Sequence, residues 1–238
     1  NGSENRRPPG WPCGVALRYT RLMKRIPELL APAGDMTSLQ AALDAGADAV
    51  YLGLDTLNMR RMATRNFTRE TLPEASSRCR ACGTRLYLTL NTLLYEGELA
   101  AAEAVLQFAK PHVDAVIVAD WGAIALCQRL GVPFHVSTQM SCANSEAARF
   151  LKRQGADRVV LARECTLDEV AAIAATAGIE VETFVHGAVC VAVSGRCLLS
   201  HEAYGCSSNR GECRQPCRRE FLIREVREGE DADAAFRV

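Results

Sequence analysis

The sequence contains no apolar run of about 18 residues, so we expect no transmembrane helix and no membrane partner. It also has no excess of charge of one sign, because 28 lysines and arginines balance 28 aspartates and glutamates. A nucleic-acid interface would therefore need a local basic surface rather than a strongly basic chain. Histidine is scarce, with four residues, and the absence of a His-Glu-x-x-His motif excludes the zinc-peptidase helix of that type.

The composition is that of an ordinary globular domain. Hydrophobic residues make up 48% and charged residues 24% of the 238 positions, which argues against disorder of the whole chain. The length suits one large domain, since a closed eight-stranded (β/α) barrel takes roughly 250 residues.

Seven short apolar runs alternate with helical stretches along the chain. The runs are apolar throughout, which is typical of strands buried on both faces of a parallel sheet. We expect these strands at residues 28–32, 49–54, 85–91, 115–120, 134–137, 158–163 and 181–186. Alanine-rich helical stretches lie between them, among them 38–46, 98–109, 145–154 and 167–177. This alternation predicts a parallel α/β domain.

Two forms of such a sheet compete, an open doubly wound sheet and a (β/α) barrel. No Gly-x-Gly-x-x-Gly motif follows an early strand, which weakens the case for a dinucleotide-binding open sheet. Polar residues end several of the expected strands, namely Asn91, Asp120, Ser137, Arg163 and His186. A ring of strand ends that converge on one site gives this pattern, so we predict a TIM-barrel-like fold.

We divide the chain into three parts. Residues 1–22 are basic and lack apolar periodicity, so we expect a disordered leader or a start-site artefact, with Met23 near the natural start. Residues 23–189 form the barrel domain, and residues 190–238 form a cysteine-rich cluster-binding region with a truncated tail. Because seven strands cannot close an eight-stranded barrel, we expect the barrel to be incomplete and the chain to be a fragment.

The eleven cysteines are the most informative feature of the composition. Four of them follow the pattern Cys190-x6-Cys197-x15-Cys213-x3-Cys217, and Cys206 lies in the same glycine-rich stretch. Thiolates are soft ligands that suit zinc or an iron–sulfur cluster. The irregular spacing favours a cluster enclosed by a loop over a zinc knuckle, and buried free cysteines or adventitious disulfides are the alternative.

Other cysteines and a group of arginines admit simpler interpretations. Cys79 and Cys82 resemble a redox pair, but they lie at a helix end, which favours buried or half-buried thiols. Five arginines accompany the cysteine-rich stretch: Arg196, Arg210, Arg214, Arg218 and Arg219. They form a solvated face, or they compensate the charge of the thiolates, or they contact a phosphate.

The strand ends supply the candidate functional residues. We name His186, Arg163 and Glu164 as catalytic candidates, because a guanidinium meets a carboxylate bidentately and a histidine moves protons near pH 7. A salt bridge between Arg163 and Glu164 is the alternative. The substrate-binding candidates are Arg60, Asn58, Asn91, Asp120, His135 and Gln139. Asn and Asp also cap helices, and His135 also suits a core position.

Several motifs together carry a family resemblance. The first cysteines stand in Glu182-x-Phe184-x2-Gly187-Ala188-Val189-Cys190-x4-Gly195-x-Cys197-x-Leu199-Ser200, and the last two in Asn209-Arg210-Gly211-Glu212-Cys213-Arg214-Gln215-Pro216-Cys217-Arg218. Further matches are Pro27–Gly34, Gly46–Gly53, His135–Gln139 and Leu161–Glu164. From Met23 to about Leu222 the sequence resembles the collagenase-like peptidase family U32.

The resemblance implies a bacterial or archaeal cytoplasmic protein with a barrel-like domain. Several branches of the family are oxygen-independent hydroxylation factors with a 4Fe–4S cluster, and prephenate is implicated as the oxygen donor for the branches that act on RNA. The four cysteines Cys190, Cys197, Cys213 and Cys217 resemble those of the RNA-modifying branches, whereas Cys206 departs from their pattern.

We therefore predict an iron–sulfur protein that hydroxylates a base of tRNA or rRNA, with prephenate as the donor and the cluster held by those four cysteines. The first alternative is a U32-type peptidase, for which His186 lies four residues from Cys190. A thiolate that already binds iron is not a free nucleophile, which weakens this alternative. The second alternative is a non-catalytic RNA-binding or maturation factor.

Overall fold

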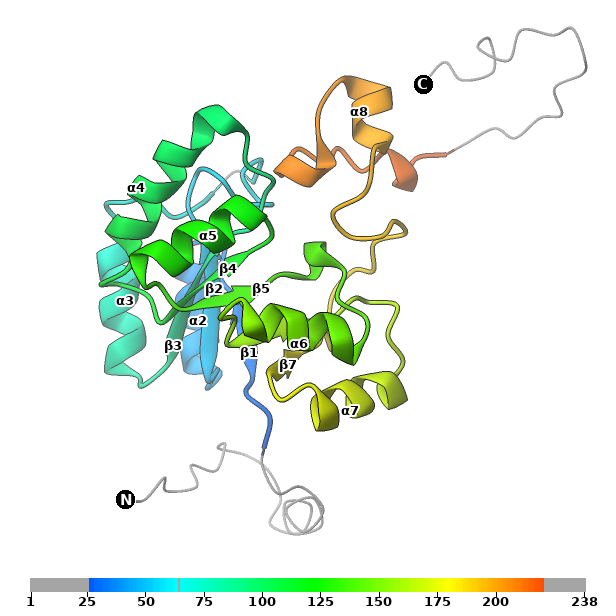
Figure 1. Cartoon of the computed structure of the whole chain (residues 1–238). Coiled ribbons are helices and arrows are strands. Elements are labelled where there is room, and N and C mark those ends of the chain that lie inside the picture. Colours follow the sequence, from blue (N-terminus) through cyan, green and yellow to red (C-terminus); the bar gives the residue numbers. More distant parts are fainter. Residues whose placement is uncertain (1–25, 64, 221–238) are drawn as a thin grey trace, which may run out of the picture.

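The computed structural model describes residues 26–63 and 65–220 (Figure 1). Its strands are β1 (Leu30–Pro32), β2 (Ala49–Gly53), β3 (Arg85–Leu90), β4 (Ala115–Val118), β5 (Phe134–Val136), β6 (Arg158–Val160) and β7 (Glu180–Glu182). Its α-helices are α2 (Met36–Asp44), α3 (Leu72–Ala81), α4 (Leu99–Ala109), α5 (Trp121–Leu130), α6 (Ser145–Arg153), α7 (Leu167–Thr176) and α8 (Leu199–Tyr204). Single 3₁₀ turns are η1 (Glu96–Glu98), η2 (Thr138–Met140), η3 (Ser208–Arg210) and η4 (Pro216–Arg218).

The strands form one parallel sheet in sequence order, from β1 to β7. Every neighbouring pair is parallel, as in the long β2–β3 ladder that joins Ala49 to Arg85 and Gly53 to Thr89. The seven strands and their parallel order were predicted from the continuous apolar runs, and the structure confirms both. All strand carboxyl ends consequently lie at one edge of the sheet.

The sheet is curled into an incomplete barrel. In a flat sheet β1 and β6 would lie five strand spacings apart, about 24 Å. Yet Glu28, two residues before β1, accepts a hydrogen bond from Arg158 at the start of β6 over 2.7 Å. Among the described strands β1 and β7 do not pair with each other. The structure therefore confirms the barrel-like form with seven strands and excludes the open doubly wound sheet.

Helices cover the outer surface of the curled sheet, and the main core lies between the two layers (Figure 1). Leu88 and Val116 on the strands pack with Leu39 and Leu106 on the helices, and all four are fully buried. A second, smaller cluster faces the inside of the barrel, formed by Ala49, Tyr87, Ala115 and Ile117. Alternate residues of each strand therefore serve the two sides of the sheet, which explains why whole strands are apolar.

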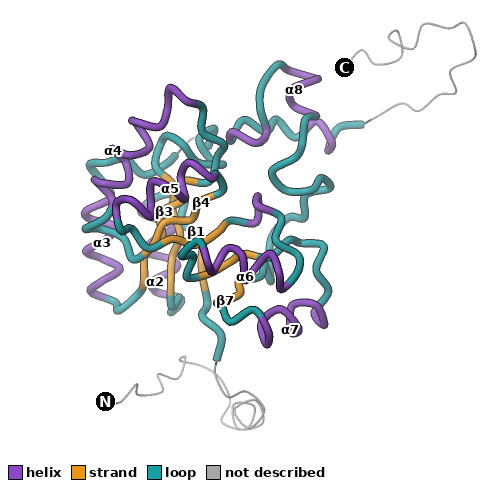
Figure 2. The backbone as a smooth tube through the Cα atoms, in the orientation of Figure 1, coloured by secondary structure: helices purple, strands orange, loops and turns teal. Residues whose placement is uncertain are grey.

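The chain beyond β7 is mostly loop, interrupted by the short helix α8 and the turns η3 and η4 (Figure 2). Residues 183–220, here called the cysteine segment, contain all four predicted cluster ligands. Residues 183–191 are exposed throughout. The expected leader 1–22, the expected start at Met23 and the tail beyond Glu220 lie outside the described residues.

None of the helices in the described part of the chain combines the length and the apolar character needed to cross a membrane.

Candidate functional site

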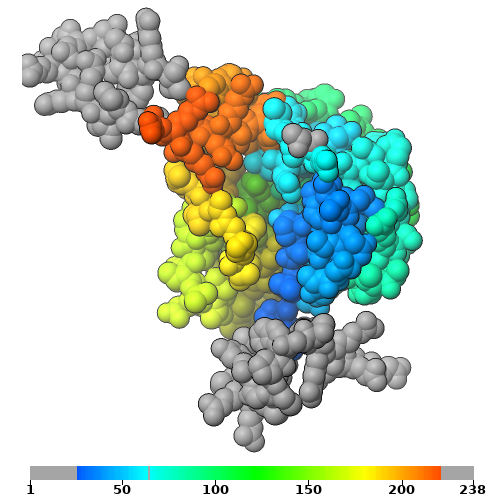
Figure 3. All heavy atoms as spheres, turned by 180° about the vertical axis from the view of Figure 1, so that it is seen from behind, coloured from blue at the N-terminus to red at the C-terminus, as the bar shows by residue number. Residues whose placement is uncertain are grey.

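A cavity of about 230 Å³ lies at the carboxyl ends of the strands. Its walls come from loops and strand ends across the sheet, from Ala33 after β1 to Phe184 after β7. Its lining comprises Ala33, Tyr51, Leu52, Gly53, Met59, Arg60, Thr89, Asn91, Ile117, Ser137, Thr138, Gln139, Val160, Arg163, Glu182 and Phe184. This is the end of a (β/α) barrel at which active sites are built. Figure 3 shows the face where the surface of residues around 185 (yellow) borders that of residues around 30 (blue).

Two arginines give the cavity its positive charge. The Arg60 side chain lies against Gly34, where an added Cβ would be 3.0 Å from its Nη2 atom. Arg163 donates a hydrogen bond from Nη1 to Ser194 Oγ over 2.6 Å, and its guanidinium lies 4.7 Å from the Phe184 ring centre. Two guanidinium groups around one small cavity favour an anionic ligand, above all a carboxylate or phosphate.

Glu182 and Tyr51 add two titratable groups to the same wall. Burial raises the pKa of the Glu182 carboxyl, although Arg158 Nη1 lies 3.3 Å from its Oε2 atom. Burial also raises the pKa of Tyr51, while the charges of Arg60 and Arg163 act in the opposite direction. Both residues were missed as site residues from the sequence. The alternation Glu180-Val181-Glu182, which places Glu182 at the carboxyl end of β7, is the signal that could have identified it.

Asn91 and Gln139 line the cavity together with the two arginines, as expected from their places after strands. Asn91 Oδ1 accepts a hydrogen bond from the backbone N–H of Met59 over 3.1 Å, which connects the β3 end to the loop after β2. Gln139 accepts a hydrogen bond from the Ser137 hydroxyl through Oε1. Four of the named candidates thus meet in one cavity.

Asn58 and Asp120 follow strands as well, but their side chains form hydrogen bonds with backbone groups and do not line the cavity. Asn58 is fully buried; its amide donates to the carbonyls of Leu54 and Thr56, and its Oδ1 atom accepts the Arg60 N–H over 2.8 Å. Asp120 caps helix α5, accepting from the N–H groups of Gly122 and Ala123. Their short polar side chains satisfy backbone groups at loop and helix starts.

His135 lies inside the barrel but does not line the cavity. Its ring packs edge-on against Tyr87 with the ring centres 4.6 Å apart, and its Nδ1 atom is buried without a hydrogen-bond partner among the described residues. Burial, aided by the charge of Arg158, lowers the pKa of His135 to about 3. Glu164 and His186 are both exposed, and neither lines the cavity.

The four cysteines proposed as cluster ligands are free thiols in the described chain. Cys190 and Cys213 are exposed, while Cys197 and Cys217 are partly buried. Their chemistry suits an iron–sulfur cluster, since free thiolates are its usual ligands. Residues 26–63 and 65–220 contain no group of three or more His, Cys, Asp or Glu side chains placed to hold a metal ion. The ligand assignment therefore stays a prediction.

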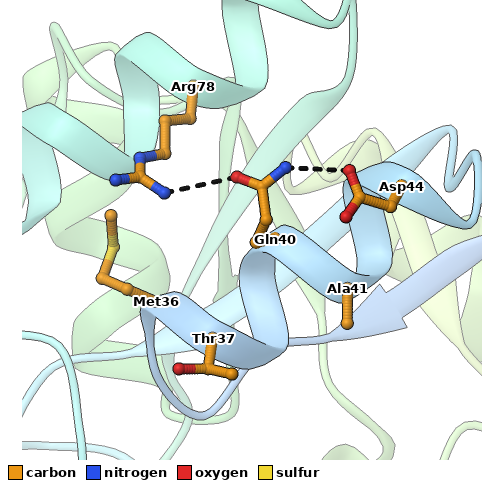
Figure 4. A pocket seen from close by; sticks show the side chains of 6 residues that line it. All are labelled: Met36, Thr37, Gln40, Ala41, Asp44 and Arg78. Carbon is orange, nitrogen blue, oxygen red and sulfur yellow. Dashed lines mark hydrogen bonds between the residues drawn. The ribbon is translucent and has the colours of Figure 1, made fainter.

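A second hollow, of about 470 Å³, lies on the outer surface between helices α2 and α3 (Figure 4). Arg78 donates to Gln40 over 3.2 Å, and Gln40 donates to Asp44 over 2.9 Å. These polar groups are already paired with each other, so the hollow offers little to a ligand.

The curled parallel sheet and its arginine-lined cavity define a (β/α) barrel-type protein whose site lies at the carboxyl ends of the strands. The sequence model of Peptidase family U32 matches residues 34–237. The chain belongs to peptidase family U32, as the motifs predicted.

Curated relatives in this family carry different names. The chain is 46% identical over 209 residues to an uncharacterized protease of Methanocaldococcus jannaschii, covering 85% of this chain and 51% of that protein. It is 38% identical over 219 residues to tRNA hydroxylation protein P1 of Bacillus subtilis, covering 91% of this chain and 51% of that protein. It is 37% identical over 199 residues to the 23S rRNA 5-hydroxycytidine C2501 synthase of Escherichia coli, covering 83% and 30%. The chain thus spans about half the length, or less, of these relatives.

A solved structure shares the fold. The U32 peptidase Mk0906 superimposes with a TM-score of 0.54 at 16% sequence identity, covering 66% of this chain and 68% of that chain. At this identity the likeness supports the barrel architecture and carries no information about activity.

Proposed function

We propose that the protein to which this chain belongs hydroxylates a base of tRNA or rRNA without using molecular oxygen. The identity of 37–38% to relatives named for tRNA hydroxylation and for rRNA hydroxycytidine synthesis carries the proposal. RNA would be the macromolecular partner, and the cytoplasm the compartment in which the two meet.

In this proposal the cavity binds the small acidic donor, prephenate. Arg60 and Arg163 would pair with its carboxylates, and Asn91 and Gln139 would hydrogen-bond its remaining oxygens. Glu182 lines the same cavity, and the Arg158 guanidinium, with Nη1 3.3 Å from Oε2, offsets the charge that this carboxyl group presents to an acidic ligand. The apolar lining, which includes Ile117 and Val160, would contact the carbon ring of such a donor.

The test uses cells that lack the full-length gene. We expect them to lose one hydroxylated nucleoside from tRNA or rRNA, measured by mass spectrometry of digested RNA, and to regain it with the wild-type gene. Arg163→Ala should not restore it, because losing charged hydrogen bonds costs about 1.5–3 kcal/mol, roughly a tenfold or greater loss of donor binding. Arg129→Ala, which removes an exposed ion pair with Glu103, is the matched control and should restore it. An unchanged nucleoside profile in the deletion strain contradicts the proposal.

We further propose that Cys190, Cys197, Cys213 and Cys217 would hold a 4Fe–4S cluster, which would supply redox or Lewis-acid chemistry. Replacing any one of the four by Ser should abolish stoichiometric iron and sulfide in anaerobically purified full-length protein. Cys206→Ser should retain them, because the Cys206 thiol lies 3.3 Å from the Glu212 carbonyl oxygen and a hydroxyl keeps that hydrogen bond. Stoichiometric zinc without sulfide would refute the cluster.

The name of the Methanocaldococcus jannaschii relative favours a peptidase as the second candidate. A serine or cysteine peptidase needs its nucleophile beside a histidine base. In the described residues no histidine side chain forms a hydrogen bond to a serine or cysteine side chain. Peptide cleavage by cluster-free protein, with unchanged nucleosides in the deletion strain, would favour this candidate.

A further inference from the structure

Most of the polar contacts between the cysteine segment and the barrel come from one loop of that segment. This loop, Ser207–Glu212, is here called the anchor loop, and it contains the turn η3. It separates Cys197 from Cys213, so it lies between the two halves of the four-cysteine pattern. Contacts that hold the anchor loop against the barrel therefore also restrain the positions of Cys197 and Cys213.

Arg210 is the residue of the anchor loop with the most contacts to the barrel. Its guanidinium forms a two-pronged ion pair with Glu98, with Nη2–Oε1 at 2.5 Å and Nη1–Oε2 at 2.8 Å. Nη1 also donates to the Leu93 carbonyl over 2.8 Å, and the guanidinium lies 4.0 Å from the Tyr95 ring centre. The Arg210 side chain is only 12% exposed, so solvent screens these contacts less than those of a surface pair. The ion pair with Arg210 lowers the pKa of Glu98 to about 2, so the pair persists at any physiological pH.

The other end of the anchor loop packs against the loop that carries Arg60. A Cβ on Gly211 would lie 2.4 Å from the Asn58 carbonyl oxygen and 3.2 Å from Met59 Cα. Glu212 pairs with Arg61, and its second carboxylate oxygen accepts the Ser207 N–H over 3.2 Å. The anchor loop therefore contacts residues on both sides of Arg60 in the sequence.

The anchor loop is also connected to the cysteines. Asn209 Nδ2 donates to the Cys197 carbonyl over 3.2 Å, and Cys213 follows Glu212 directly. By contrast, the stretch 183–191 around Cys190 is exposed throughout. The anchor loop thus connects the barrel to Cys197 and Cys213.

We infer that Arg210 is a positioning residue, which holds the anchor loop against the loops after β2 and β3 and so sets the cysteine segment and Arg60 in place together. The expected effect of Arg210 on activity rests on the proposed RNA hydroxylation. The expected effect of Arg210 on the position of the anchor loop is independent of that proposal. Arg210 does not line the cavity, so it acts through the anchor loop and not by touching a ligand.

The test uses the full-length protein and two readouts, amide hydrogen exchange of residues 207–212 and the hydroxylated nucleoside in complemented deletion cells. Arg210→Ala should raise exchange in the anchor loop at least tenfold while exchange in β2 to β6 stays unchanged, and should lower the nucleoside at least tenfold. Arg210→Lys should give exchange rates and nucleoside levels between those of wild type and Arg210→Ala, because an ammonium group keeps the charge but not the two-pronged geometry. The charge-swapped double variant Arg210→Glu with Glu98→Arg should recover part of the exchange protection and part of the nucleoside that Arg210→Glu alone loses.

Two glycines provide a variant that leaves Arg210 intact. Gly211→Ala introduces the clash with Asn58 and should loosen the anchor loop in the same way. Gly205→Ala is the control, because Gly205 has a similar positive φ of 64° but nothing within 4 Å of an added Cβ. Arg129→Ala, which alters an exposed ion pair on helix α5, should change neither readout.

Unchanged exchange in Arg210→Ala would overturn the inference. Faster hydrogen exchange in the anchor loop of Arg210→Ala together with full hydroxylation would also overturn it, since the loop would then contribute to stability alone. If the deletion strain shows no nucleoside loss, the proposed function fails, and the exchange experiment still decides whether Arg210 holds the loop.

Discussion

At the scale of single residues, burial decides which of the polar side chains inside the barrel carry charge. His135 and Glu182 both face the interior near Arg158, yet burial favours the neutral form of each. Arg163 stays exposed at the cavity rim and paired only with the Ser194 hydroxyl among the described residues. Burial therefore opposes a positive charge on His135 and a negative charge on Glu182, while the guanidinium groups of Arg60 and Arg163 line the cavity.

His135 makes stability depend on pH. Its pKa of about 3 in the fold lies below the ordinary value of 6.5, so the unfolded chain binds this proton more readily than the native state. The free energy of unfolding should therefore fall as the pH drops from 6.5 towards 3, with a contribution from His135 of up to about 1.4 kcal/mol per pH unit.

Urea denaturation at a series of pH values checks this prediction. His135→Gln should show a shallower loss of stability over that pH range than wild type, whereas His201→Gln, which changes an exposed histidine, should show the wild-type slope. Equal slopes for wild type and His135→Gln would contradict it.

At the scale of elements, the cysteine segment meets the barrel a second time at the turn that contains Ser194 and Gly195. The Ser194 carbonyl accepts from the Ser141 hydroxyl over 3.0 Å, and its hydroxyl accepts from Arg163. Gly195 has a φ of 75°, and an added Cβ would lie 2.4 Å from the Gln139 carbonyl oxygen. Only glycine allows this close approach of the two backbones.

Gly195→Ala should detach this turn from the cavity rim. Because a displaced turn is open to proteases, we expect tryptic cleavage after Arg196 to become roughly tenfold faster. Gly187→Ala is the matched control: Gly187 also has a positive φ, of 125°, but an added Cβ meets nothing within 4 Å. Mass spectrometry of short digests provides the measurement, and equal cleavage rates in the two variants would argue against a tight contact at Gly195.

At the scale of the whole molecule, a cluster of ions inside the barrel connects the two ends of the curled sheet. Arg158 pairs with Glu28 before β1 and with Glu180 and Glu182 on β7, and its side chain is only 6% exposed. Its guanidinium also lies 5.4 Å from the Tyr87 ring centre on β3. One buried side chain therefore joins strands that are far apart in the order of the sheet.

Removing this arginine should destabilise the whole fold. Arg158→Met removes the buried cation that pairs with Glu28, Glu180 and Glu182, and it leaves Glu28 only its ion pair with the exposed Arg85. Breaking one partner of a buried ion pair costs about 3–5 kcal/mol. Arg129→Met is the control, since its exposed pair with Glu103 contributes about 0–1 kcal/mol. Chemical denaturation of both variants measures the difference, and a loss below about 1 kcal/mol for Arg158→Met would refute the role of the cluster.

The sequence by itself determined the seven strands, their parallel order and the family. Continuous apolar runs indicate strands that are buried on both faces, and this pattern can be read within each short segment of the sequence. The sequence also placed Asn91, Gln139 and Arg163 at or just after strand ends and Arg60 in the loop after the second strand, and the cavity forms from these parts of the chain. The ligand roles of the four cysteines stay a prediction, because thiol spacing alone does not fix how a loop brings thiols together.

Only the tertiary structure decided which polar residues after the strands face the cavity. Asn58 and Asp120 have the same sequence signal as Asn91, but a loop and a helix start use their side chains to satisfy backbone groups. Tyr51 and Glu182 point into the cavity because the sheet curls, and curling depends on contacts between residues as distant as Glu28 and Arg158. Such contacts join segments 130 residues apart, so no local pattern contains them.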